Sequence, residues 1–290
     1  METREHEVIF ENYIRHNSIP EKRNIITSNG SVYLPAKMAE AIFLVMREFP
    51  LQKLITRETT GYLKNRVPYI KSNVPVSWTS EGEEYPKFDF ELSEKVLKQN
   101  KVGAIIKVSE ELTADSSFNI MQLLSESFGH ALGEELEKVF ISGYGNKKPS
   151  GFIHDCNNVS AAGSTIQYQD IINVFNELEL KYLVNASWLV SQKTLSELSV
   201  LADSNNNKLL SPGSSEADGY MLGKPVHITF MPDHSPLCLG DYQYYKVLDK
   251  APEIKHLGEL YALEGLVGFR LTQYLDGKLI EPNAICALEM

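Results

Sequence analysis

Residues 75–118 constrain the fold of this chain more than any other stretch. Trp78 is followed by the acidic turn Ser80-Glu81-Gly82-Glu83, and strand-like residues lie on both sides of that turn. The stretch continues into an alternating strand from Val102 to Val108 and then, after an acidic link, into a long amphipathic helix. It contains no pattern that indicates catalysis. We therefore expect a long β-hairpin that projects from a sheet and a helix and holds a neighbouring molecule.

The predicted hairpin has residues 67–78 and 85–107 as its two sides. Prolines occur at Pro68, Pro75 and Pro86, and proline suits an edge strand because it has no backbone donor. A two-stranded arm cannot bury both of its faces on its own body. We therefore expect the arm to pack on an adjacent subunit, with Trp78 as its apolar anchor.

The helix that follows is predicted to begin at a cap on Ser116 or Ser117 and to end at Gly143. Its apolar side chains recur at helical spacing on one face. A helix of about 25 residues at ~1.5 Å per residue is roughly 37 Å long, which suits a structural spine. The apolar stripe consists of Ile120, Leu123, Leu124, Phe128, Ala131, Leu136 and Phe140.

The remaining sequence predicts a mixed α+β chain. Turn-forming residues are densest in 203–219, which we expect to be an exposed loop. The other expected elements are a helix from Met38 stopped by Pro50, a helix from Ser164-Thr165 with Gln167 in its capping box, short strands at 187–190, 225–230, 237–239 and 244–248, and two long antiparallel strands in 253–290 with a turn at Asp276-Gly277.

Composition and charge exclude several classes of protein. The chain has 290 residues and a net charge of −10, and a reader of nucleic acid needs clustered Lys and Arg instead. Cys156, Cys238 and Cys286 form no CxxC motif, so we expect a reduced compartment and no disulfide framework. No signal peptide and no apolar run of about 20 residues is present, so we expect no membrane partner.

Apparent cofactor and metal motifs in the sequence are incomplete. Gly143-Tyr144-Gly145 follows a helix, whereas a phosphate-binding loop opens one. Residues 203–214 begin like a calcium loop, but Lys208 stands where that loop needs glycine. His154 and Cys156 would share a face of a strand, but no second pair has metal-ligand spacing. We expect no cofactor and no metal.

An enzyme is the alternative from a different class. It would be a hydrolase that uses either Glu83 and Glu84 or the region of His154 and Cys156. Adjacent carboxylates in a hairpin turn usually point to solvent, whereas acid–base work needs them to converge on one bond. Neither GxSxG nor HExxH occurs. We expect no catalytic residues.

Further segments occur in an order that is typical of one family. They are Ser142-Gly143-Tyr144-Gly145, Lys148-Pro149-Ser150-Gly151-Phe152-Ile153, Asn185-Ala186-Ser187-Trp188-Leu189-Val190, Met221-Leu222-Gly223-Lys224-Pro225-Val226, Leu239-Gly240-Asp241-Tyr242 with Tyr245, Phe269-Arg270, and Pro282-Asn283-Ala284-Ile285. Together with residues 75–118, they cover roughly residues 31–290. The chain resembles the major capsid proteins of tailed bacteriophages, which have the Hong Kong phage-type capsid fold.

The resemblance implies an α+β fold with an N-terminal arm, an extended hairpin loop, a peripheral domain built on a long spine helix, and an axial domain. The ranges that it implies are 1–30 for the N-terminal arm, 31–54 for the start of the peripheral domain, 55–100 for the extended loop, 101–160 for the peripheral domain with the spine helix, 161–250 for the axial domain, and 251–290 for the terminal strands of the peripheral domain.

The resemblance also implies function and partners. The subunit would assemble with itself into hexamers and pentamers of an icosahedral shell around double-stranded DNA, which it would enclose without sequence-specific binding. A separate scaffold protein and a portal would be further partners, with assembly in the bacterial host cytoplasm and the virion capsid as the final location. The expected assembly residues are Trp78, Glu81 and Gly82 in the hairpin and Asn205, Asn206 and Asn207 in the axial loop.

One point distinguishes this chain from some relatives of that kind. Some members crosslink a hairpin Lys to an Asn of a neighbour. Lys64, Lys71 and Lys87 are available, but no Asn lies between Pro252 and Pro282, so we expect noncovalent cohesion. An encapsulin-like nanocompartment shell is the nearest alternative, because it has the same fold but encloses an enzyme.

Overall fold

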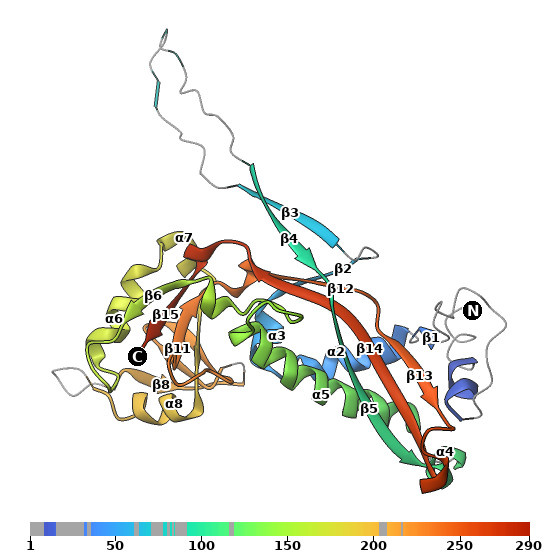
Figure 1. Ribbon diagram of the computed structural model, residues 1–290. Coiled ribbons are helices and arrows are strands. Elements are labelled where there is room, and N and C mark those ends of the chain that lie inside the picture. The colour runs from blue at the N-terminus through green and yellow to red at the C-terminus, as the bar shows by residue number, and fades with distance from the viewer. Residues whose placement is uncertain are drawn as a thin grey trace.

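The computed structural model describes residues 9–15, 32–33, 36–60, 64–70, 78–79, 82, 84, 92–115, 119–202, 208–215 and 217–290. Two sheets, a long helix and a projecting hairpin make up the described part of the chain (Figure 1). Residues 9–15 are helical. The other α-helices are α2 (Ala36–Met46), α3 (Pro50–Leu54), α4 (Glu110–Ala114), α5 (Ile120–Ser142), α6 (Tyr168–Glu177), α7 (Leu180–Leu183) and α8 (Gln192–Leu198).

The first sheet, called here the long-strand sheet, is six-stranded with the order β1-β13-β14-β12-β2 and with β5 paired to β14. Its strands are β1 (Val32–Tyr33), β2 (Thr56–Thr59), β5 (Asn100–Ser109), β12 (Tyr245–Asp249), β13 (Glu253–Leu257) and β14 (Leu266–Leu279). The 14-residue strand β14 is antiparallel to β5, β12 and β13 and therefore organises the sheet.

The predicted turn at Asp276-Gly277 is wrong, because both residues lie inside β14. The carboxylate of Asp276 accepts hydrogen bonds from the backbone N–H groups of Lys98 (2.7 Å) and Gly277 (2.9 Å). A Cβ on Gly277 would lie 2.7 Å from the hydroxyl of Tyr245. The glycine is therefore needed for the close approach of a packed tyrosine, and not for a reversal of the chain.

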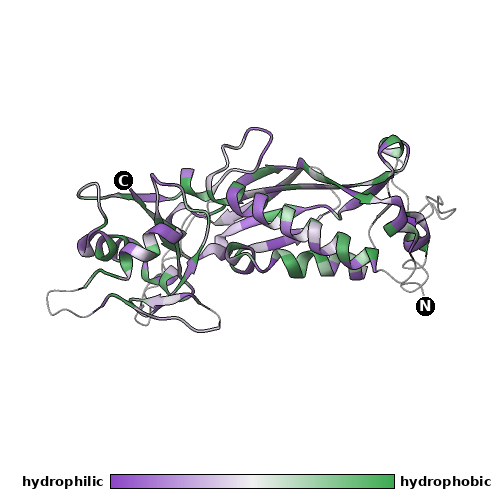
Figure 2. Ribbon diagram, turned by 90° about the horizontal axis from the view of Figure 1, so that it is seen from below, coloured by the Kyte–Doolittle hydropathy of each residue, from purple (hydrophilic) through white to green (hydrophobic). Residues whose placement is uncertain are grey.

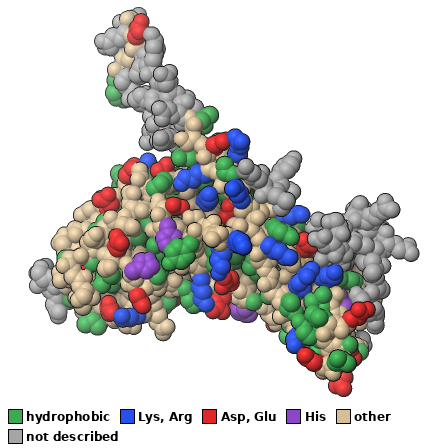
Figure 3. All heavy atoms as spheres, in the orientation of Figure 1, with side chains coloured by type: hydrophobic (Ala, Val, Ile, Leu, Met, Phe, Trp, Pro, Cys, Tyr) green, Lys and Arg blue, Asp and Glu red, His purple; other side chains and the backbone are tan. Residues whose placement is uncertain are grey.

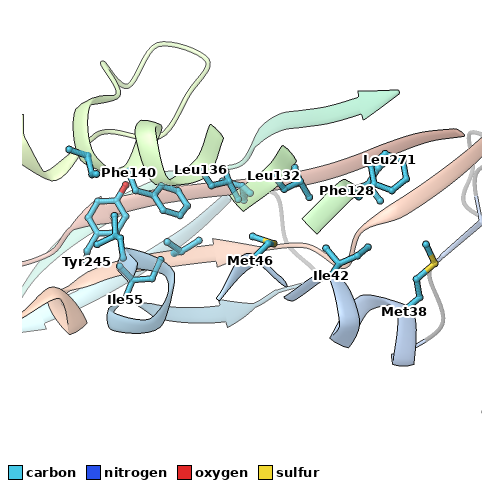
Figure 4. Packing of buried hydrophobic residues seen from close by; sticks show 14 of the residues in the cluster. Met38, Ile42, Met46, Ile55, Phe128, Leu132, Leu136, Phe140, Tyr245 and Leu271 are labelled. Atoms are coloured by element: carbon cyan, nitrogen blue, oxygen red, sulfur yellow. The ribbon is translucent and has the colours of Figure 1, made fainter. Parts of the chain in front are cut away.

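Helices α5 and α2 cover one face of the long-strand sheet, as the view from below shows (Figure 2). Figure 4 shows Met38, Ile42 and Met46 of α2 facing side chains of α5. The helices approach closely at two glycines of α5: a Cβ on Gly129 would lie 2.6 Å from Val45, and one on Gly133 would lie 2.4 Å from the ring of Phe49. Larger residues at these positions would force the helices apart.

The predicted spine helix is confirmed as α5, but it has 23 residues and a different cap. The side-chain oxygen of Asn119 accepts from the N–H of Gln122 at 3.1 Å, which is the role expected of Ser116 or Ser117. Those two residues lie outside the described part of the chain. Pro50 does not stop α2, which ends at Met46; it opens α3, where a missing N–H is harmless.

The second sheet, called here the buried sheet, is seven-stranded with the order β6-β15-β11-β7-β10-β9-β8. Its central strands β7, β11 and β15 are almost entirely buried, with hydrophobic clusters on both faces. Its strands are β6 (Asn157–Ser160), β7 (Ser187–Val190), β8 (Leu210–Pro212), β9 (Gly219–Met221), β10 (Lys224–Ile228), β11 (Leu237–Gly240) and β15 (Ile285–Glu289).

Two expectations about this half of the chain are wrong. Helix α6 begins at Tyr168 after an N-cap at Gln167, whose capping-box partner is Asp170, and not at Ser164-Thr165. The last strand of the chain, β15, pairs with β11 and β6 in the buried sheet. Residues 251–290 therefore do not form one unit of terminal strands, since β13 and β14 lie in the long-strand sheet and β15 does not.

The hairpin is present, but its sides differ from the prediction. Strand β3 (Lys64–Ile70) pairs with β4 (Leu92–Lys98) in a separate two-stranded sheet that points away from the body (Figure 1). Residues 100–107, expected on one side of the hairpin, pair with β14 instead. Most of the segment between Ile70 and Leu92 lies outside the described residues.

Candidate assembly interface

The predicted assembly residues are only partly described. The side chain of Trp78 is completely exposed, at 103% of its reference area. Gly82 has φ +91°, and no heavy atom lies within 4 Å of a Cβ built on it, so its left-handed backbone favours glycine. Glu81 and Asn205–Asn207 lie outside the described residues. A fully exposed tryptophan is unusual in a subunit that acts alone.

The long-strand sheet has a second face, which the helices do not cover. Along β5, Val102, Ala104, Ile106 and Val108 pack toward the core, while Lys101, Gly103, Ile105 and Lys107 point the other way and are exposed. The side chain of Ile105 is 48% exposed, although isoleucine is usually buried. The strand thus has one buried side and one open side.

The open side is basic. Strand pairing places Arg270 of β14 directly between Ile105 of β5 and Lys255 of β13. Lys101 lies beside Tyr274, and the ammonium of Lys250 lies 5.9 Å from the centre of the Tyr274 ring. Figure 3 shows Lys and Arg side chains gathered over this sheet. We call the residues Lys101, Ile105, Lys107, Lys250, Lys255 and Arg270 the basic face.

Acidic side chains lie at the ends and edges of the basic face, among them the exposed Glu110, directly after β5, and Glu259, in the turn between β13 and β14. Glu264 pairs with Lys107 at 3.0 Å, and Glu58 pairs with Lys246 at the far edge, at 3.7 Å. Glu253 and Asp276 point to the same side but are buried, at 7% and 4% exposure. For a chain with a net charge of −10, this face concentrates charge of the opposite sign.

One end of the basic face carries exposed apolar side chains. Leu260 and Leu263, in the turn between β13 and β14, are 65% and 105% exposed. Tyr261 fixes this turn to the sheet: its ring lies against Gly268, and the ammonium of Lys107 lies 4.2 Å from the ring centre. Charged and apolar groups therefore lie side by side here, as at a protein–protein interface.

A buried polar network joins the two sheets. Glu137, near the C-terminal end of α5, is fully buried, and its Oε1 accepts from the backbone N–H of Leu51 (2.9 Å) and from the hydroxyl of Thr229 (2.7 Å). Leu51 belongs to α3, beside the long-strand sheet, and Thr229 follows β10 of the buried sheet. Burial raises the pKa of Glu137, while these hydrogen bonds act in the opposite direction.

No catalytic or metal-binding constellation is formed by the described residues. No group of three or more His, Cys, Asp or Glu among them could hold a metal ion. The ring of His154 stacks on Tyr144 with 4.9 Å between centres, and its Nε2 lies 3.2 Å from the carbonyl oxygen of Ser142. Burial raises the pKa of the Cys156 thiol to about 12, so this thiol is a poor nucleophile at neutral pH.

The described part of the chain contains no helix that is both long and apolar enough to span a membrane.

The sequence reasoning missed the basic face. Its signal is present in the alternation of Lys101 and Lys107 with apolar residues, but the contributions of β12, β13 and β14 depend on strand register. Register is a long-range property that periodicity alone does not give.

Comparison with known proteins identifies the family. A profile of the Phage capsid family matches residues 30–290. The chain belongs to this family. Among solved structures, the capsid of a native GTA particle computed with C5 symmetry is 18% identical, with a TM-score of 0.67 over 93% of this chain and 94% of that one. A chain of Mycobacterium phage Adephagia is 14% identical, with a TM-score of 0.60 over 83% and 89% of the two chains. No curated protein matches the chain.

The family match confirms the resemblance and the α+β capsid fold expected from the sequence. The chain is a structural phage capsid protein of the major capsid type, and not an enzyme. Neither the encapsulin-like shell nor the hydrolase is favoured. Proteins of this family form the capsid of the virion, so a second copy of the same chain is the first partner to consider for the exposed surfaces.

Proposed function

We propose that this subunit assembles with itself into hexamers and pentamers of an icosahedral shell that encloses double-stranded phage DNA. The observation that carries the proposal is the projecting hairpin with its completely exposed Trp78. Burying a tryptophan side chain that was exposed to water is favourable by a transfer free energy on the order of 3 kcal/mol. A subunit that leaves the side chain exposed lacks this contribution. A neighbouring subunit that buries it would recover that free energy.

The domain assignment follows the two sheets. The long-strand sheet with α5 corresponds to the peripheral domain, and the buried sheet with α6, α7 and α8 corresponds to the axial domain. Asn205–Asn207 would then lie in an axial loop near the symmetry axes, where one contact repeats five or six times around a ring. Residues 1–30 would be the N-terminal arm.

The remaining partners and the location are part of the same proposal. A separate scaffold protein and a portal would direct assembly in the host cytoplasm, and DNA would be enclosed without sequence-specific contacts. Cohesion would be noncovalent, because no Asn lies between Pro252 and Pro282 to meet Lys64, Lys71 or Lys87 of a neighbour. Interfaces well above ~1,600 Å² for each subunit would be needed to hold such a shell.

Sedimentation and negative-stain microscopy of the purified protein test this proposal. We expect rings or closed shells, formed in greater yield as protein concentration rises. A protein that stays monomeric at every concentration and salt condition, while its circular dichroism shows a folded chain, would contradict the proposal. Shells that contain a co-purified enzyme and no DNA after isolation from infected cells would favour the nanocompartment instead.

A further inference from the structure

We propose that the short helix at residues 9–15, called here the N-terminal clasp, is held to the long-strand sheet by an acid-sensitive contact, and that protonation of His256 releases it. The inference does not depend on the proposed function, because it concerns how one subunit holds its own N-terminal segment. The clasp lies at one end of the molecule, beside β13 and α4 (Figure 1).

Apolar side chains dock one face of the clasp on the body. Phe10, Tyr13 and Ile14 have helical spacing and are at most 3% exposed, and they belong to the same core cluster as α2, α5 and the long-strand sheet. Glu11 and Asn12 lie on the opposite, exposed face. So short a helix is not stable in water by itself. Its structure therefore depends on the contacts that dock it.

Hydrogen bonds tie the clasp to β13 and to α4. Strand β1 pairs with the first two residues of β13. Two residues further along, the backbone N–H of His256 donates to the hydroxyl oxygen of Tyr13 at 2.9 Å. At the other side, the guanidinium of Arg15 donates to the carbonyl oxygens of Thr113 (3.1 Å) and Asp115 (2.8 Å) at the end of α4. The tyrosine thus serves as the acceptor for a donor of the strand.

The ring of His256 lies between the clasp and the sheet. Its centre is 6.1 Å from that of the Tyr13 ring and 5.3 Å from that of the Phe269 ring, with edge-to-face geometry in both pairs. Its Nδ1 is buried and has no hydrogen-bond partner. An imidazolium donates from both nitrogens. Protonation would therefore place a charge and an unpaired donor between two aromatic rings, which is unfavourable.

The titratable and charged groups next to this ring do not favour its protonation. Burial lowers the pKa of His256. From the clasp, the ring faces Tyr13, whose pKa burial raises, so its hydroxyl is uncharged. Lys255 precedes the histidine in β13, and Arg270 follows Phe269 in β14. Both are cations, which oppose a further positive charge nearby.

The carboxylates of the neighbouring elements are exposed to solvent. Glu11 pairs with Arg15 on the clasp itself, at 3.0 Å. Asp115, after α4, and Glu259, after β13, are both exposed. Water and salt screen charges in such positions. These groups therefore offer little compensation to an imidazolium that is partly buried.

The direction of the pH effect follows from the lowered pKa. His256 binds a proton less readily when the clasp is docked than when it is released, where the ordinary value of about 6.5 applies. Docking is therefore strongest above about pH 6.5, and it weakens as the pH falls from there through the lowered pKa of the docked state. Because a single proton is involved, the docking equilibrium changes by at most about tenfold per pH unit.

Hydrogen exchange of the full-length protein, read by mass spectrometry at residues 9–15, tests the inference. The wild type is compared with His256→Phe at the same pH, so the intrinsic pH dependence of exchange cancels. Phenylalanine keeps a ring between Tyr13 and Phe269 and keeps the backbone N–H, but it does not titrate. We expect the ratio of exchange rates, wild type over variant, to rise about three- to tenfold from pH 7.5 to pH 5.5.

A matched control and a second readout keep the test decisive. His130→Gln changes an exposed histidine of α5 and should exchange as the wild type does. Labelling of Ile14→Cys relative to Asn12→Cys, on the buried and exposed faces of the clasp, leaves His256 in place and cancels the ionisation of the thiol. This labelling ratio should also rise as the pH falls.

Two results would overturn the inference. One is a ratio of exchange rates, or of labelling rates, that stays constant between pH 7.5 and pH 5.5. The other is a rise in the labelling ratio that persists unchanged when His256→Phe is added, since the flanking His6 or His16 would then be the titrating group. Either result leaves the proposed function untouched, because self-assembly is not measured in these experiments.

Discussion

The two sheets of this capsid protein are covered in opposite ways. In the buried sheet, β7, β11 and β15 carry apolar residues on both faces, one against α6, α7 and α8 and the other against the end of α5. In the long-strand sheet, one face packs on α5 and α2, and the other carries Lys and Arg with isolated apolar groups. Both faces of the buried sheet are covered within the subunit, whereas one face of the long-strand sheet is not.

The difference explains how one chain can be both a stable subunit and a building block. A sheet buried on both sides contributes to folding and has little left to offer a neighbour. A sheet with one open face keeps its strand order through the core on the other side and leaves exposed side chains of the open face for contact. Substitutions in the buried sheet should therefore affect folding, and substitutions on the exposed surfaces should affect assembly.

The largest effect on folding is expected at a tryptophan of the buried sheet. Trp188 is fully buried, and its Nε1–H donates to the carbonyl oxygen of Met221 at 3.0 Å. Trp188→Ala should lower the free energy of unfolding by about 3–5 kcal/mol, measured by urea denaturation of unassembled subunits.

The chain's other tryptophan is the matched control. Trp78 is completely exposed, so Trp78→Ala should change subunit stability by less than about 0.5 kcal/mol while it blocks assembly in sedimentation. If Trp78→Ala assembles at the normal rate and yield, Trp78 is not an anchor. If both variants unfold equally easily, the division between residues that stabilise the fold and residues that serve assembly is wrong.

The covered face of the long-strand sheet should tolerate little added volume. Gly277→Ala would bring a methyl group to 2.7 Å from the Tyr245 hydroxyl, which itself donates to the carbonyl oxygen of Ser150 at 2.8 Å. We expect a loss of about 1–3 kcal/mol in thermal or urea unfolding. Gly163→Ala is the control, because nothing lies within 4 Å of its Cβ position. Equal stability of the two variants would show that Tyr245 can move aside at no cost.

The junction between the sheets should be sensitive to pH through Glu137. Burial raises its folded pKa above the value of about 4.3 in an unfolded chain. The wild-type protein therefore loses stability from this group as pH rises through the folded pKa. Glu137→Gln removes that titration, and its amide oxygen can still accept from Leu51 and Thr229.

The stability of Glu137→Gln relative to wild type should therefore increase from about pH 4 toward neutral pH, as measured by urea unfolding across that range. Asp249 and Asp276, whose pKa values burial also raises, titrate in both proteins and cancel in the difference. A difference that is independent of pH would contradict the assignment of Glu137 as a buried, titrating group.

The smallest effect on stability is expected in the proposed axial loop. Deleting Asn205–Asn207 shortens a connection whose closure entropy varies only slowly with length, so the melting temperature of the subunit should hardly change. Ring formation should be weakened or altered, as seen by electron microscopy. Unfolding of the subunit would place this segment in the core, and unaltered rings would place it away from the symmetry axes.

Local sequence signals predicted most of the elements but not their pairing. The stripe of α5 and the apolar run at 187–190 were enough to place a helix and a strand, because helical and alternating periods act over a few residues. The prediction of a turn at Asp276-Gly277 was wrong because the same dipeptide can also lie inside a strand. Here the absence of a side chain on Gly277 leaves space for the ring of Tyr245. The basic face and the junction at Glu137 depend on strand register and on contacts between distant segments, which no local pattern records.

A cryo-electron microscopy reconstruction of the assembled shell would compare the two sheets in place. We expect the open face of β5, β14 and β13 to be covered by a neighbouring subunit, while both faces of the buried sheet are covered within the subunit itself. A shell in which the open face is bare to solvent, and in which subunits meet through the buried sheet instead, would contradict this division between folding and assembly.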